Sequence, residues 1–218
     1  MRDITDIYSE YKIMPMLAIH QIRVAAVANI VCDSLSVPVD KDNIIKACLL
    51  HDMGNIIKFN LNHFPIQKNE PRGVDYWEQV KEEYIIKYGN NEHVASVKIA
   101  KELDMPNYVI DLVASVESAL ILDKSIKNDN DFGKKICNYA DGRVTPHNVT
   151  SIKERSDEAK KRYENHPHYF SEKDRFLFVS EMEEIEKEIF VHSKIKPEDI
   201  NDDCVQIYID KLKTFELN

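Results

Sequence analysis

The sequence predicts an all-α protein, on two observations of composition and one of pattern. Its 218 residues include only 5 glycines and 8 prolines, fewer than a turn-rich β architecture needs. The long segments between them are rich in Leu, Ile, Lys, Glu and Ala, which favour helices, and their apolar residues recur near helical spacing. Because 43% of the residues are hydrophobic, the chain can supply a substantial core.

The first helices follow from spacing and capping signals. The segment 16–35 has recurring apolar residues and neither glycine nor proline, which predicts one long helix. Asp40 is the expected N-cap of a second helix, which ends near Met53 and Gly54, so that His51 and Asp52 occupy its last turn. Further helices are predicted at 76–88, 93–103, 108–122 and 132–142.

Between the helix that ends near Gly54 and the helix predicted at 76–88, residues 58–75 are polar and broken by prolines and a glycine. The stretch has no sustained apolar period, which predicts an excursion over the surface that could serve as a lid.

The character of the chain changes beyond Pro146. Residues 152–163 are heavily charged, and a Glu-rich helix that follows carries one narrow apolar stripe, Phe178, Met182, Ile185 and Ile189. A last helix is expected at about 200–212. We therefore predict a helical domain over residues 1–148 and a helical extension over 149–218. Packing of the extension on the domain is favoured over the alternative, a homodimer seam.

Composition also excludes several classes of function. A net charge of -9, without a local basic patch, argues against general nucleic-acid binding. The four cysteines lie far apart without a C-x-x-C pair, and Cys48 and Cys137 stand in apolar helical stretches, which indicates core packing. The most apolar stretch, 14–32, is interrupted by polar residues, so no membrane segment is expected. A cytoplasmic location is predicted.

Four polar residues stand in segments otherwise fit for burial: His20, His51, Asp52 and Asp141. A buried carboxylate without a partner is unfavourable by several kcal/mol, and two such carboxylates attract a cation. Imidazole and carboxylate groups are ligands for divalent transition metals. Taken singly, each residue has an ordinary alternative, a satisfied core histidine or a solvated aspartate.

The order and spacing of these four residues resemble the HD-domain superfamily of metal-dependent phosphohydrolases, over roughly residues 16–145. The segment Leu49-Leu50-His51-Asp52-Met53-Gly54 is the most specific match. The resemblance implies an HD-domain helical bundle in which His20, His51, Asp52 and Asp141 hold a divalent ion (Mn, Mg, Fe, Co, Ni or Zn).

The resemblance also implies an activity, hydrolysis of a nucleotide or small phosphate ester by metal-activated water. Two alternatives stay open: an oxygenase with two irons on the same fold, and a non-catalytic module that binds a metal or a nucleotide.

Catalytic and substrate-binding roles are assigned on the same resemblance. Asp52, His93 and Asn55 are the expected catalytic residues; His93 stands where two-metal relatives carry an added histidine, and its alternative is a solvent-exposed helix start. Those relatives also carry a later pair of histidines, which is replaced in this chain by Val116-Glu117-Ser118. One metal ion is therefore expected. A second ion would lack these ligands, although Glu117 could supply an oxygen. Asn55 can orient water but cannot take its proton. The expected phosphate-binding cations are Arg23, Lys58 and Arg143, with surface charges as the alternative.

Other histidines and cations receive an ordinary interpretation. His166-Pro167-His168 is expected to be exposed, and His63 is expected to be a loop residue of the lid rather than a ligand. Lys68 and Arg72 in the lid are weaker phosphate-binding candidates.

Overall fold

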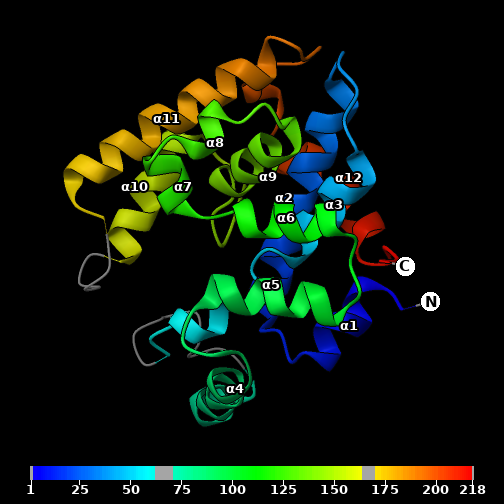
Figure 1. Cartoon of the computed structure of the whole chain (residues 1–218), viewed down its shortest axis with the longest axis vertical. Coiled ribbons are helices and arrows are strands. Elements are labelled where there is room, and N and C mark those ends of the chain that lie inside the picture. The colour runs from blue at the N-terminus through cyan, green and yellow to red at the C-terminus, as the bar shows by residue number, and fades with distance from the viewer. Residues whose placement is uncertain (1, 62–70, 164–169, 218) are drawn as a thin grey trace.

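The computed structural model describes residues 2–61, 71–163 and 170–217 of the chain. These residues form twelve α-helices and two 3-10 helices, and no β-strand occurs among them (Figure 1). The prediction of an all-α fold is confirmed. The lid residues His63 and Lys68 and the triplet His166-Pro167-His168 lie outside the described part of the chain.

The long helix α2 (Pro15–Ser34) is the centre of the bundle. It packs against α3 (Lys41–Leu50), α9 (Phe132–Gly142) and α12 (Asp202–Leu212), which surround it in Figure 1. By length and composition α2 could cross a membrane, and 61% of its apolar window is buried inside the molecule. Its apolar character is accounted for by its place in the core of the helical bundle.

Helix α3 begins as the sequence predicts and ends earlier. The Asp40 carboxylate accepts a hydrogen bond from the backbone N–H of Asn43 at 3.3 Å, as an N-cap does. The α-helix stops at Leu50 rather than near Gly54, and a turn leads into the 3-10 helix η1 (Asn55–Lys58). The Gly54 N–H donates to Ser96 Oγ at 2.9 Å, which ties this turn to the neighbouring helix.

The helices that follow include one correction. Helices α4 (Gly73–Tyr88) and α5 (Glu92–Glu102) are found near their predicted bounds. The single helix predicted at 108–122 is instead two, α6 (Asn107–Ser115) and α7 (Ser118–Leu122), followed by the short α8 (Ser125–Asn128). At the break, the carbonyl of Ser115 accepts a hydrogen bond at 2.9 Å from Asn138 Nδ2 of α9, so a side chain replaces the missing helical N–H.

The described C-terminal helices lie against the rest of the molecule. Helix α10 (Ile152–Arg162) packs on α9 and on α11 (Glu172–Phe190), and α11 also packs on α7, α8 and α9. The stripe residues Met182, Ile185 and Ile189 are fully buried within the chain. Helix η3 (Pro197–Asp199) leads into α12. The division of the chain at residue 148 remains a prediction.

Near the N-terminus the structure adds a helix that the sequence analysis did not predict, α1 (Ile4–Glu10). Asp3 caps it by accepting a hydrogen bond from the Asp6 N–H at 2.9 Å. The Ile4 N–H donates to the Phe215 carbonyl at 2.9 Å, so the two ends of the described chain lie together (Figure 1).

Candidate metal centre

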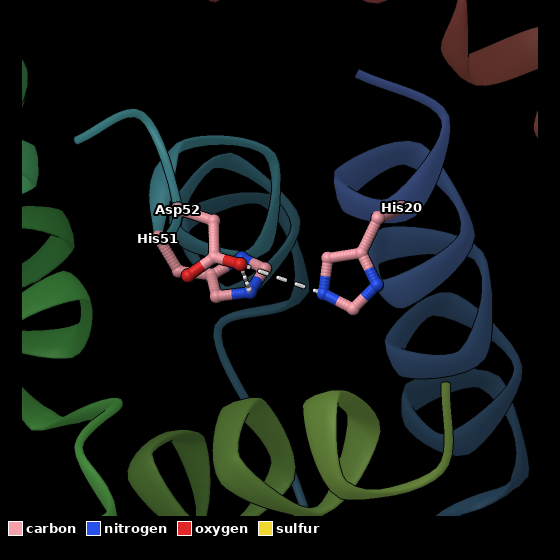
Figure 2. Close-up of side chains that lie close together, drawn as sticks. All are labelled: His20, His51 and Asp52. Carbon is pink, nitrogen blue, oxygen red and sulfur yellow. Dashed lines mark ion pairs between the residues drawn. The ribbon is translucent and has the colours of Figure 1, made fainter. Parts of the chain in front are cut away.

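Three helices bring the predicted metal ligands to one point. His20 lies on the first half of α2, His51 and Asp52 directly follow α3, and Asp141 lies in the last turn of α9. Figure 2 shows the His20 imidazole reaching from α2 toward the Asp52 carboxylate, with the His51 ring beside it. Residues more than 120 positions apart in the sequence thus share one site.

The distances between these side chains suit a single bound ion. Asp52 Oδ2 lies 3.6 Å from both His20 Nε2 and His51 Nε2. Asp141 Oδ1 lies 3.1 Å from His20 Nε2 and 3.5 Å from His51 Nε2. Ligand atoms at about 2.1 Å from one transition-metal ion stand about 3.0–3.4 Å apart, close to this spacing.

The orientation of the His51 ring is determined by the backbone. His51 Nδ1 donates a hydrogen bond to the Cys48 carbonyl at 2.8 Å, which turns Nε2 toward the two carboxylates. His51 Nε2 is buried, and it has no hydrogen bond of good geometry, only the longer contacts with Asp52 and Asp141. A buried polar atom without a partner is unfavourable, and metal-binding histidines usually donate their other ring N–H in this way. Both features fit a metal ligand.

The charges in this cluster are strongly coupled. Burial lowers the pKa of His51, but the negative charges of Asp52 and Asp141 outweigh it and raise that pKa to about 9. Desolvation raises the pKa of Asp141, but hydrogen bonding to His20 and His51 outweighs it and holds the pKa well below its ordinary range. Burial lowers the pKa of His20 despite the neighbouring carboxylates. Two carboxylates beside two imidazoles therefore form a site that favours a positive charge.

These observations meet the requirements for a divalent-metal site. Two imidazoles and two carboxylates form a donor set that zinc, iron, manganese and related ions accept. Among the described residues, His20, His51 and Asp52 are the group whose potential ligand atoms all lie within 4.8 Å of one another. Asp141 joins them through its contacts with both histidines.

Gln21, next to the ligand His20, supports the centre from behind. Its side chain is fully buried, and its Oε1 accepts a hydrogen bond from the Asp52 backbone N–H at 3.2 Å. The contact links α2 to the turn that carries Asp52. Sequence patterning gave no sign of this role, because a glutamine in a buried helix has no distinctive spacing.

The metal centre opens into a cavity of about 770 Å³, within the range of small-molecule sites. His20, Asp52 and Asp141 line it, and so do the predicted site residues Asn55, Lys58 and His93. His93 is therefore at the cavity and not at a helix start facing only solvent. Glu117 lines the same cavity from the start of α7.

Lys58 and His93 share one carboxylate. Lys58 Nζ lies 4.0 Å from Glu92 Oε1, and His93 Nε2 lies 3.6 Å from the same oxygen. Glu92 begins α5 and also lines the cavity. The two basic groups therefore lie together around Glu92, on the η1 and α5 side of the site.

Two predicted phosphate-binding cations do not line this cavity. Arg23 donates to the Pro146 carbonyl at 3.4 Å, and burial lowers its pKa although the charge of Asp202 opposes this. Arg143 is 4% exposed and donates to Tyr139 Oη and to the backbone carbonyls of Thr150, Pro197 and Ile200. Arg23 thus contacts Pro146, which does line the cavity, whereas Arg143 is directed into the core, so proximity in sequence to a ligand does not make either arginine a lining residue.

Two arginines of α10 line the cavity instead, Arg155 and Arg162. The sequence analysis described their segment only as heavily charged. Their seven-residue separation, which places both on one face of a helix, was the available signal. That signal is weak without knowing which face meets the site.

The comparisons with known proteins agree with this geometry. The model of one protein family, described as HD domain, matches residues 17–207. No curated protein and no solved structure matches the chain. The match includes all four candidate ligands and both cavity-lining arginines.

Proposed function

Because the chain belongs to the HD domain family, a superfamily of metal-dependent, hydrolase-type proteins, we propose that it is a metal-dependent phosphohydrolase of a nucleotide or another small phosphate ester. The observation that carries this proposal is the cluster in which the buried Nε2 of His51 faces Asp52 and Asp141 without a hydrogen bond of good geometry, beside a cavity that also holds basic groups.

His20, His51, Asp52 and Asp141 would hold the divalent ion. When bound, such an ion lowers the pKa of water toward neutrality and polarises a phosphoryl oxygen. Asp52 would face the ion with Oδ2, which lies 3.6 Å from both imidazole Nε2 atoms, and its other carboxylate oxygen would hold the proton taken from water. The Asn55 amide is 4% exposed and lines the cavity, so it would orient water without taking its proton.

The negatively charged phosphoryl oxygens of the substrate would face the basic groups of η1 and α5. The Lys58 ammonium would stabilise negative charge on the phosphoryl oxygens, since a fixed cation in a partly enclosed site acts strongly on developing charge. His93 would hold a proton at Nε2, supported by Glu92 at 3.6 Å, and deliver it to the leaving oxygen.

The test is phosphate release by purified protein loaded separately with Mn²⁺, Mg²⁺, Co²⁺, Ni²⁺, Zn²⁺ or Fe²⁺. Nucleoside mono-, di- and triphosphates and common phosphoesters form the substrate panel. We expect turnover with at least one ion, lost by at least 100-fold in Asp52→Asn. Turnover should fall by about 10²–10⁴-fold in His93→Gln, the range of general acid catalysis.

Two results would oppose the proposal. One is metal-loaded protein that releases no phosphate from any member of the panel. The other is an Asp52→Asn variant with unchanged turnover and unchanged metal content. Oxygen consumption with two irons per chain would support the oxygenase alternative, and nucleotide binding without turnover would support a binding module.

A further inference from the structure

The cavity has a second basic wall, formed by α10 and separate from Lys58 and His93. Arg155 and Arg162 both line the cavity, and their seven-residue separation places them on one face of α10, two turns apart. The wall belongs to the C-terminal part of the chain, whereas the candidate metal ligands belong to α2, the turn after α3 and α9. Two parts of the chain thus face the same space.

Glu158, between the two arginines on α10, holds them in place. Arg162 Nε and Nη2 each lie 3.0 Å from a Glu158 carboxylate oxygen, which is the bidentate geometry of a strong ion pair. Arg155 Nη1 lies 3.5 Å from the same carboxylate. One carboxylate faces two guanidinium groups, so this cluster keeps an excess of one positive charge.

The hydrogen bonding of the cluster is also incomplete. Arg155 Nε is buried and makes no hydrogen bond. A guanidinium group offers five N–H donors and no acceptor, and the outer Nη groups, rather than the enclosed Nε, are the donors that a phosphate oxygen in the cavity would meet. Phe178 and Met182 of α11 line the same cavity. Such apolar neighbours lower the local dielectric and strengthen the attraction of an anion.

Arg162 lies within electrostatic reach of the candidate metal centre. Burial lowers the pKa of Arg162, but Glu158, Tyr163 and, most weakly, Asp141 outweigh it and raise that pKa. Asp141 is the candidate ligand at the end of α9, and it lines the same cavity as Arg155 and Arg162. A compact molecule can therefore contact both.

We propose that Arg155 and Arg162 form a second anion subsite, which binds a phosphoryl group of the substrate other than the one at the metal. The subsite rests on the proposed function for the first phosphoryl group. The substrate then carries two phosphoryl groups, as a phosphoanhydride or as a bisphosphate, and simple monophosphates bind with only part of the available contacts.

The experiment measures the binding of non-hydrolysable anions to the full, metal-loaded chain at constant free metal. Isothermal titration compares methylenediphosphonate with methylphosphonate, which has one phosphonate group. We expect wild type to prefer the diphosphonate, and Arg155→Gln and Arg162→Gln each to weaken it about tenfold, as the loss of a charge-assisted contact does. Methylphosphonate binding should change less than twofold.

Lys161→Gln is the matched control, because it removes the same charge from an exposed neighbour of Arg162 on α10. It should leave both affinities unchanged. Arg155→Lys and Arg162→Lys keep the charge and lose the guanidinium fork, so they should weaken the diphosphonate by a smaller factor. They provide the test if a glutamine variant does not fold, as judged by thermal unfolding and metal content.

Comparison of ADP with adenosine 3′,5′-bisphosphate, each against AMP, separates adjacent from distant phosphoryl groups. An arginine-dependent gain for either supports the subsite and identifies the source of the second group. If all four arginine variants keep the wild-type preference for the diphosphonate, the subsite is overturned even where phosphate release persists. If the arginine-dependent preference is found without any hydrolysis, the subsite stands and the proposed function fails.

Discussion

Gly54, which follows the metal pair after one residue, is required by close packing between the metal-carrying turn and α5. A Cβ atom at this position would lie 2.3 Å from the Glu92 carbonyl oxygen and 2.6 Å from Ala95 Cβ. Backbone atoms cannot move aside as a side-chain end can, so a methyl group here must displace α5 or the turn itself. The glycine therefore connects the backbone at the metal ligands to the helix that bears His93.

We expect Gly54→Ala to lower the free energy of unfolding by about 1–3 kcal/mol, the typical range for overpacking, or by more. Metal affinity should fall with it, because the turn carries His51 and Asp52. Gly142→Ala is the control: its Cβ meets only the flexible end of Met182, at 2.6 Å. Urea unfolding and metal titration provide the measurements, and equal effects of the two substitutions would contradict the argument.

Arg143 has a structural role at the end of α9. It is almost fully buried and donates to the Pro197 and Ile200 carbonyls, each at 3.2 Å, which joins α9 to the segment before α12. Arg143→Gln should lower the free energy of unfolding by about 2–4 kcal/mol, because several buried acceptors lose a charged donor. Lys161→Gln is the surface control. A change of less than 0.5 kcal/mol, or about the size of an ordinary surface effect, would contradict this role.

At the scale of the element, α10 depends on its N-terminal cap. Ser151 Oγ accepts from the Glu154 N–H at 3.2 Å, and Glu154 Oε2 accepts from the Ser151 N–H at 3.1 Å. This reciprocal pair is a capping box. Ser151→Ala should lower the free energy of unfolding by about 1 kcal/mol. Because α10 carries Arg155 and Arg162, the same substitution should also weaken anion binding in the cavity.

The same box predicts a pH dependence. Hydrogen bonds from Thr150 and Ser151 lower the pKa of Glu154 from 4.5 to about 2. A folded-state pKa below the unfolded value means that the ionised group stabilises the fold above pH 4.5. This contribution is then lost as the pH falls from about 4.5 to about 2.

Glu154→Gln removes the titration and keeps a side chain that can act in a capping box. The difference in unfolding free energy between wild type and this variant should be constant above pH 5 and shrink toward pH 2. Solvent exposure of Glu154 keeps the difference small, below about 1 kcal/mol. Glu82→Gln, at an exposed position of α4, is the control. Urea titrations between pH 2 and 7 measure both, and a difference that does not vary with pH would exclude the mechanism.

At the scale of the whole molecule, a metal held by α2, α3 and α9 should stabilise the fold. A ligand at 100 times its dissociation constant adds about 2.7 kcal/mol, which for a domain of this size raises Tm by about 5–10 °C. His51→Ala should abolish this shift, and the exposed His147→Ala should keep it. Thermal unfolding with metal and with a chelator measures the shift. Metal analysis should find one ion per chain, and two ions would contradict the single site.

Much of the helical fold can be predicted from the sequence, because local signals mark where helices begin. Asp40 caps α3 as predicted, and α9 covers the predicted 132–142. The break between α6 and α7 could not be predicted, because the Ser115 carbonyl accepts a hydrogen bond from Asn138, a residue 23 positions away in the sequence. Helix α1 is short, and a hydrogen bond to Phe215 near the other end of the chain holds its first residue.

The sequence by itself determined which groups form the candidate metal centre. Apolar helical segments carry His20, the pair His51-Asp52 and Asp141. Buried polar groups of this kind are stable only when they contact one another or bind a cation. Only the tertiary structure decided which cations face the cavity. A guanidinium group lies several bonds from its backbone, so its position depends on which helix face packs inward and on its partners. That packing directs Arg143 into the core and places Arg155 and Arg162 beside the metal centre.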